Sequence, residues 1–77
     1  MARVYLLIKV DSGKENDVYE ALKNLPYVKT VDIVTGPLDL VAVFEADNLS
    51  RIEEVILNRV RRIEGIRETT TLIALTD

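Results

Sequence analysis

The sequence predicts an α+β domain in which two helices cover one face of a four-stranded antiparallel sheet. The prediction rests on two observations. With 77 residues, the chain has room for one core and no second functional unit. Along it, strand-like and helix-like patterns alternate as β-α-β-β-α-β, which is the ferredoxin-like order. Right-handed crossovers in this order place both helices on the same face of the sheet.

The first three elements are a strand, a helix and a second strand. Val4–Val10 is rich in β-branched and large apolar residues without a turn former, which predicts a buried strand. Ser12 followed by Glu15 fits a capping box that starts a helix. Pro26 ends this helix. Its apolar stripe consists of Val18, Ala21, Leu22 and Leu25.

A hairpin is predicted next, because the turn-forming segment Gly36–Asp39 separates the strands Val28–Thr35 and Leu40–Glu45. The first of these strands is expected toward an edge of the sheet. Its alternation places Val31 and Ile33 on one side, and Val28, Thr30, Asp32 and Val34 on the other.

The last two elements are a helix and a strand. Asp47 or Asn48 is expected to cap the helix, and Gly65 to follow its end as the C′ residue. The apolar stripe consists of Leu49, Ile52, Ile56, Val60 and Ile63. Thr69–Leu75 supplies the final strand. The two halves of the chain have similar links from helix to strand, since Leu25-Pro26-Tyr27-Val28 in the first half corresponds to Ile63-Glu64-Gly65-Ile66 in the second.

The strands predicted at 4–10 and 40–45 carry apolar side chains on both faces. One face holds Val4, Leu6, Ile8, Leu40, Ala42 and Phe44, and the other holds Tyr5, Leu7, Val41 and Val43. A sheet with one solvated face would instead alternate apolar with polar residues. Because the helices cover only one face, we expect a second copy of the chain to cover the other, which makes the protein a homo-oligomer.

Composition argues against several functions. The net charge of −3 opposes direct binding to DNA, and no stretch is long and apolar enough for a membrane span, so we expect a cytoplasmic protein. Without Cys or His, and without a glycine-rich phosphate loop, we expect no enzyme, no metal site and no cofactor. The absence of Cys, His, Gln and Trp, together with abundant Glu, Lys and Arg, suits a thermophile.

Other charged and aromatic residues have ordinary explanations. The carboxylates of Asp11, Asp17 and Glu20 are spaced like a helix start and a solvated helix face. The basic cluster Arg59-Arg61-Arg62 is expected in the last turn of the second helix, where cations complement the helix dipole. RNA recognition on this fold needs aromatic residues on the central strands, but Tyr5 and Phe44 should face opposite ways.

Two polar segments could bind a free amino acid. Backbone groups around Gly36, the Asp39 carboxylate and the hydroxyl groups of Thr69-Thr70-Thr71 offer donors for a carboxylate and an acceptor for an ammonium group. The same residues are ordinary in a hairpin turn and a β-strand, and the residue types alone favour this structural interpretation over a ligand site.

Over essentially all 77 residues, the chain resembles the C-terminal effector domain of Lrp/AsnC transcription regulators, the RAM domain. Thr35-Gly36-Pro37-Leu38-Asp39-Leu40-Val41 is similar to the family's T-G-x-Y-D-h-h signature. Ile63-Glu64-Gly65-Ile66-Arg67-Glu68-Thr69-Thr70-Thr71 is similar to its I-x-G-V-x-x-T-x-T ending. The resemblance implies that residues 1–77 form a single ligand-binding domain. It also implies a ligand site at Gly36, Leu38, Asp39, Thr69 and Thr71, with Leu38 where the family has Tyr.

The resemblance also implies dimers that pair through their sheets, assemble into octamers or decamers and bind a free amino acid effector. Family members place a helix-turn-helix before this domain, whereas here Met1 is followed almost at once by the first strand. We therefore expect a stand-alone form that lacks the DNA reader and regulates transcription through partners, among them full-length Lrp/AsnC regulators. The alternative is a ferredoxin-like dimeric α/β-barrel protein with a structural or small-molecule enzymatic role.

Overall fold

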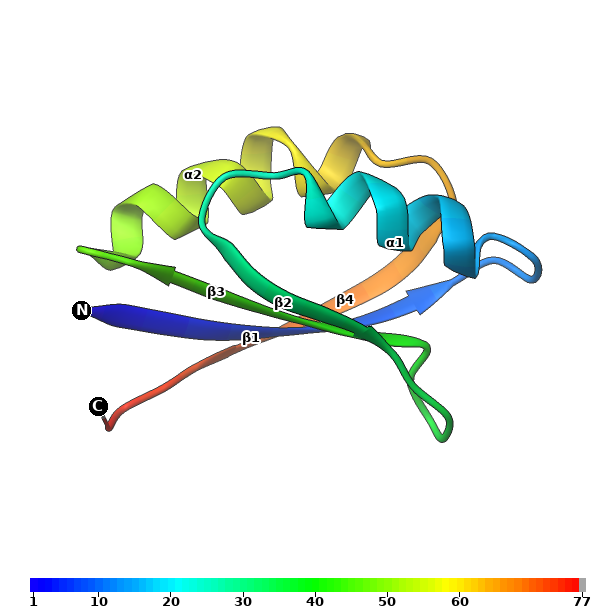
Figure 1. Cartoon of the computed structure of the whole chain (residues 1–77), viewed down its shortest axis with the longest axis horizontal. Helices are drawn as coiled ribbons and strands as arrows, with labels where there is room; N and C mark the ends of the chain where they lie inside the picture. The colour runs from blue at the N-terminus through cyan, green and yellow to red at the C-terminus, as the bar shows by residue number, and fades with distance from the viewer. Residues whose placement is uncertain (77) are drawn as a thin grey trace.

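The computed structural model describes residues 1–76 and confirms the predicted ferredoxin-like α+β fold (Figure 1). The elements are β1 (Ala2–Val10), α1 (Glu15–Lys23), β2 (Val28–Ile33), β3 (Leu40–Ala46), α2 (Leu49–Asn58), a 3-10 turn (Val60–Arg62) and β4 (Ile66–Ile73). Both helices lie on the same side of the sheet, and the opposite side carries no helix. The order of elements along the chain is the one predicted.

The four strands form one antiparallel sheet in the order β2-β3-β1-β4. The two most apolar strands, β1 and β3, are therefore central, and β2 and β4 are the edges. Leu6 of β1 lies opposite Ala42 of β3 on one side and Thr71 of β4 on the other. The predicted hairpin of β2 and β3 is present, with Ile33 opposite Leu40 beside the turn.

The core lies between the helices and the face of the sheet that they cover, which we call the closed face. Alternate residues of β1 and β3 are buried there because successive side chains of a strand point to opposite faces. From the sheet, the fully buried members are Val4, Leu6, Ile8, Leu40, Ala42 and Phe44. Val18 and Leu22 of α1 pack on them, as do Ile52 and Val55 of α2.

The start of α1 differs from the prediction. Lys14 occupies the N-cap position without a side-chain cap, and the helix begins at Glu15, so the capping box of Ser12 and Glu15 is wrong. The reason is a preceding turn, in which Gly13 adopts a φ of 85° and the Lys14 N–H donates to the Asp11 carbonyl at 3.0 Å. This turn places Ser12 too far before the helix to cap it.

The end of α2 also differs. Asn48 caps its start as predicted, accepting from the Arg51 N–H at 3.2 Å. The helix ends at Asn58, however, and a 3-10 turn follows, so Gly65 is not its C′ residue. Of the basic cluster, Arg59 is the C-cap of α2 and the other two arginines lie in the 3-10 turn, outside the helical turn in which they were predicted.

The edge strands are shifted relative to the prediction. In β2, the register changes between Val28 and Thr30, so Val28 pairs with the buried Phe44 and lies on the same face as Val31. The predicted separation of these two valines is wrong, because the irregularity inserts one unpaired residue. The last strand, predicted at Thr69–Leu75, spans Ile66–Ile73.

Candidate functional site

The predicted effector turn, Gly36–Asp39, connects β2 to β3 at the end of the sheet where β1 finishes. Gly36 has a φ of 129°, which a residue with a side chain rarely adopts. Asp39 closes the turn through its backbone: the Val34 N–H donates to the Asp39 carbonyl at 2.9 Å, and the Asp39 N–H donates to the Ile8 carbonyl at 2.9 Å. These bonds fix the turn against β1.

The Asp39 side chain also has a structural role. Its Oδ2 accepts a hydrogen bond from the Val10 N–H at 2.8 Å. Val10 follows a register shift in the pairing of β1 with β4, and Asp39 supplies the acceptor for its N–H at that point. The structure therefore commits one carboxylate oxygen of Asp39 to the fold.

The two threonines of the predicted site lie on the closed-face side of β4. Thr69 is opposite Ile8, and Ile8 is opposite Leu40, so the three residues form a row across β4, β1 and β3. Thr69 therefore lies about 10 Å from Leu40, two strand spacings away. Thr71 lies one step further along β4. Thr70, opposite Leu7, points to the other face of the sheet.

Among the predicted site residues, Thr71 alone lines a cleft at the β4 edge of the sheet. This cleft, of about 330 Å³, lies between α2 and β4 and is lined by Glu53, Ile56, Leu57, Arg61, Thr71 and Ile73. Leu57 and Ile73 are 55% and 47% exposed, which is unusual for large apolar side chains on a helix-covered face. Sequence reasoning missed these two residues, although Leu57 stands outside the stripe that α2 buries.

The remaining predicted site residues do not line the cleft at Thr71. Leu38 and Asp39 are half-buried, and Gly36 and Thr69 are exposed. None of these four lines the cleft at Thr71 or either of two other clefts, which lie beside Tyr27. The structure thus brings the turn and Thr69 to the same end of the sheet, but it does not join them to Thr71 in one pocket.

The face of the sheet that carries no helix, which we call the open face, is apolar at its centre. Tyr5, Leu7, Val41 and Val43 are only half-buried there, and Leu72 is 48% exposed. Tyr5 lies opposite Val43, whereas Phe44 is buried on the closed face, so the two aromatic residues face opposite ways as predicted. The Arg3 Nε donates to the Tyr5 hydroxyl at 3.0 Å, which orients the ring at the margin of this face.

The charged residues of the described chain do not form a metal centre. Residues 1–76 contain no group of three acidic side chains placed to hold an ion. The basic cluster Arg59-Arg61-Arg62 is exposed, and within the described residues none of the three forms an ion pair. No helix between residues 1 and 76 is long and apolar enough to cross a membrane.

The chain is similar to known proteins in both sequence and fold. An uncharacterized HTH-type transcriptional regulator of Pyrococcus abyssi is 35% identical over 69 residues, which are 90% of this chain and 44% of the regulator. The chain thus spans less than half of that relative. A solved structure from Thermus thermophilus is 31% identical, with a TM-score of 0.93, and the match covers all of this chain and 96% of that one.

A more distant structure shares the fold. A transcriptional regulator of Neisseria meningitidis, solved as a complex with L-Met, is 14% identical with a TM-score of 0.79, and the match covers 99% of this chain and 51% of that one. The family model described as the Lrp/AsnC ligand binding domain matches residues 3–77. Since this match takes in every strand and both helices, the chain belongs to the Lrp/AsnC ligand binding domain family.

Proposed function

We propose that the protein is an amino-acid-binding and oligomerisation module that serves transcriptional regulation of amino-acid metabolism, acting through partner regulators of its own family. The observation that carries the proposal is the open face, because over the two central strands it leaves an apolar surface that no segment of residues 1–76 covers. Pairing two such faces would remove this surface from water and give a two-fold dimer.

The margin of the open face suits such a pairing. Arg3 and Glu45 lie opposite each other at one end of the central strands, and Lys9 lies opposite Glu68 at the other. Glu45 also pairs with Lys29 at 3.2 Å. An apolar centre with charges of both signs around it is the usual anatomy of a protein interface.

The effector site would be completed by neighbouring copies. In one chain, Gly36 and Thr69 are exposed, Asp39 is half-buried, and Thr71 lines a cleft at the sheet edge. A free amino acid needs donors for its carboxylate, an acceptor for its ammonium group and a surface for its side chain. Asp39 Oδ1, the threonine hydroxyls and the apolar cleft supply these groups on separate parts of the surface, so assembly has to unite them.

An apolar amino acid fits this surface best. Ile56, Leu57 and Ile73 supply apolar contact area beside Thr71, and Glu53 and Arg61, which also line the cleft, carry one charge of each sign. The complex of the Neisseria regulator with L-Met is in keeping with this choice. Leu38, in place of an aromatic residue, adds a further apolar contact beside the turn.

Calorimetric titration of the assembled protein with L-Met, L-Leu, L-Lys and L-Glu tests the proposal. We expect saturable binding of the two apolar amino acids and at least tenfold weaker binding in Thr71→Val, which removes the hydroxyl and keeps the shape. Thr70→Val is the matched control, since Thr70 points to the other face of the same strand. Absence of heat with all four ligands, or equal affinity in the Thr71 and Thr70 variants, would contradict the proposed site.

A further inference from the structure

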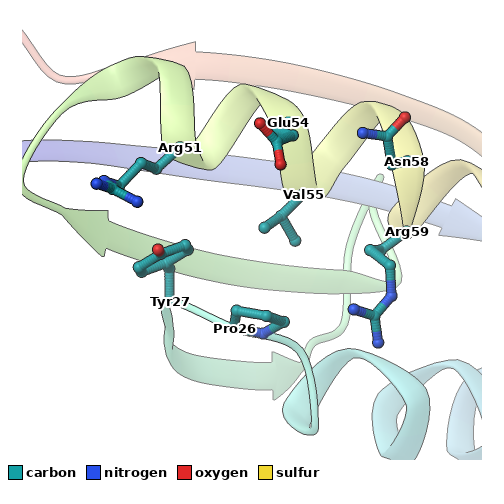
Figure 2. A pocket seen from close by; sticks show the side chains of 7 residues that line it. All are labelled: Pro26, Tyr27, Arg51, Glu54, Val55, Asn58 and Arg59. Atoms are coloured by element: carbon teal, nitrogen blue, oxygen red, sulfur yellow. The ribbon is translucent and has the colours of Figure 1, made fainter.

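A second cleft lies on the other side of α2, remote from β4. It runs between α2 and the link that joins α1 to β2, and has a volume of about 280 Å³ (Figure 2). Figure 2 shows Arg51 and Arg59 at its two ends, with Val55 between them and with Pro26 and Tyr27 on the opposite wall. Glu54 and Asn58 complete the lining. The proposed effector site contains none of these residues.

Tyr27 has an unusual backbone at this cleft. Its φ is 68°, and it is the one non-glycine residue with a positive φ within residues 1–76. This conformation costs a residue with a side chain about 1–2 kcal/mol. The Tyr27 carbonyl accepts from the Glu45 N–H at 2.9 Å, which holds the link against β3. The fold therefore fixes the backbone conformation of Tyr27, and a glycine at this position would adopt it with less strain.

The second half of the chain shows what the fold requires at this position. Gly65 occupies the corresponding place in its link and has a φ of 101°. A side chain there would meet Lys14, since an added Cβ would lie 2.9 Å from the Lys14 Cβ. At Tyr27 the side chain lies instead in the open cleft and is 39% exposed. Part of the Tyr27 side chain thus remains accessible to a ligand in the cleft.

The charges of the cleft favour an anion near Arg59. Within the described residues, neither Arg51 nor Arg59 forms an ion pair. Arg51 also borders a neighbouring cleft that contains Glu45 and Asp47, so two acidic residues lie beyond its end of the cleft. At the Arg59 end, Asn58 adds a neutral amide, while Glu54, the one acidic residue of the lining, lies beside Val55 between the two arginines (Figure 2).

We propose that this cleft binds a small aromatic anion, with its ring against Tyr27, Pro26 and Val55 and its carboxylate or phosphate paired with Arg59. A guanidinium group recognises either anion through two parallel hydrogen bonds. The volume suits a small metabolite with a single ring. Arg51 strengthens binding through its charge, and Glu54 weakens it.

Nuclear magnetic resonance titration with phenyl phosphate and phenylacetate, with benzyl alcohol as the neutral probe, tests this site and identifies the anion class. We expect saturable shifts of the Arg59 Nε and Tyr27 resonances with at least one anion and none with benzyl alcohol. Arg59→Gln should weaken binding at least tenfold, and Arg51→Gln severalfold. Glu54→Gln should tighten binding, because it removes the repulsive charge.

Two further variants separate binding from folding. Tyr27→Gly removes the ring but relieves the backbone, so it should leave the fold intact and abolish binding of the aromatic anions. Arg62→Gln changes an exposed arginine that lines neither this cleft nor the cleft at Thr71; it is the matched control and should bind like the original protein. Unsaturable shifts with both anions, undiminished affinity in Tyr27→Gly, or binding confined to an acidic peptide of Glu and Gly would overturn the proposal.

Discussion

The two faces of the sheet are built from the same strands but differ in how the chain completes them. On the closed face, alternate residues of β1 and β3 are sealed by α1 and α2, and Val4, Leu6 and Phe44 have no exposed surface. On the open face, their neighbours Tyr5, Leu7 and Val43 are equally apolar but only half-buried. Strands with two apolar faces are typical of sheets covered on both sides.

The helices of one chain thus bury the closed face of the sheet, whereas the open face stays partly exposed. A domain of this size buries a small core and is marginally stable by itself. Within residues 1–76 there is no cysteine that could form a disulfide bond and no metal centre that could stabilise the fold. Closing the open face by a second copy would therefore contribute stability as well as a binding surface.

The largest expected effect is on the closed face. Phe44→Ala should lower the free energy of unfolding by about 3–5 kcal/mol, because it leaves a cavity among fully buried neighbours. Urea denaturation measures this loss. Phe44→Leu, which retains most of the volume, should cost much less. If both variants unfold at the same urea concentration as the original protein, Phe44 does not support the core that the structure shows.

A charge on the open face should affect assembly instead. Val43→Asp places a carboxylate at the centre of the proposed interface, where it would be buried without a partner, so we expect monomers at micromolar concentrations. Sedimentation velocity measures the change. Ile33→Asp is the control, because Ile33 is already 45% exposed at the sheet edge and should tolerate the charge without a change in mass. An assembly unchanged by Val43→Asp would exclude this face as the contact.

The smallest expected change in folding is at the turn where the effector site is proposed. Asp39→Asn keeps an oxygen for the Val10 N–H but removes the negative charge, so the free energy of unfolding should fall by about 1 kcal/mol. Binding of L-Met should fall at least tenfold, because the ammonium group loses its counter-charge. Asp39→Ala would mix the two effects by leaving Val10 unpaired. Unchanged affinity in Asp39→Asn would remove this residue from the ligand site.

The sequence predicted the fold well because hydrophobic periodicity and turn residues determine it. The alternation in β1 and β3 and the stripes of the two helices identified the two faces and most of the core, but the predicted stripe of α2 left out Val55, which is buried. Boundaries were less predictable, because they depend on local backbone hydrogen bonds. The turn from Asp11 to Lys14 displaced the predicted helix cap, and the irregularity beside Val28 moved that residue to the closed face.

The candidate site was predictable only in part. The motif around Gly36 and Asp39 is visible in the sequence, but the hydrogen bond from Val10 to Asp39 joins residues 29 positions apart and has no local signal. The apolar cleft at Leu57 and Ile73 likewise depends on α2 lying beside β4. Contacts between distant segments follow from the tertiary arrangement, which residue spacing alone does not specify.

Native mass spectrometry of the purified protein, with and without a pool of free amino acids, tests the central claim most directly because it measures assembly and ligand together. We predict an even-numbered oligomer that carries an amino-acid adduct and whose population increases with the ligand, since binding at subunit contacts is linked to assembly. A bare monomer at all concentrations, with or without amino acids, would contradict both the paired open faces and the shared effector site.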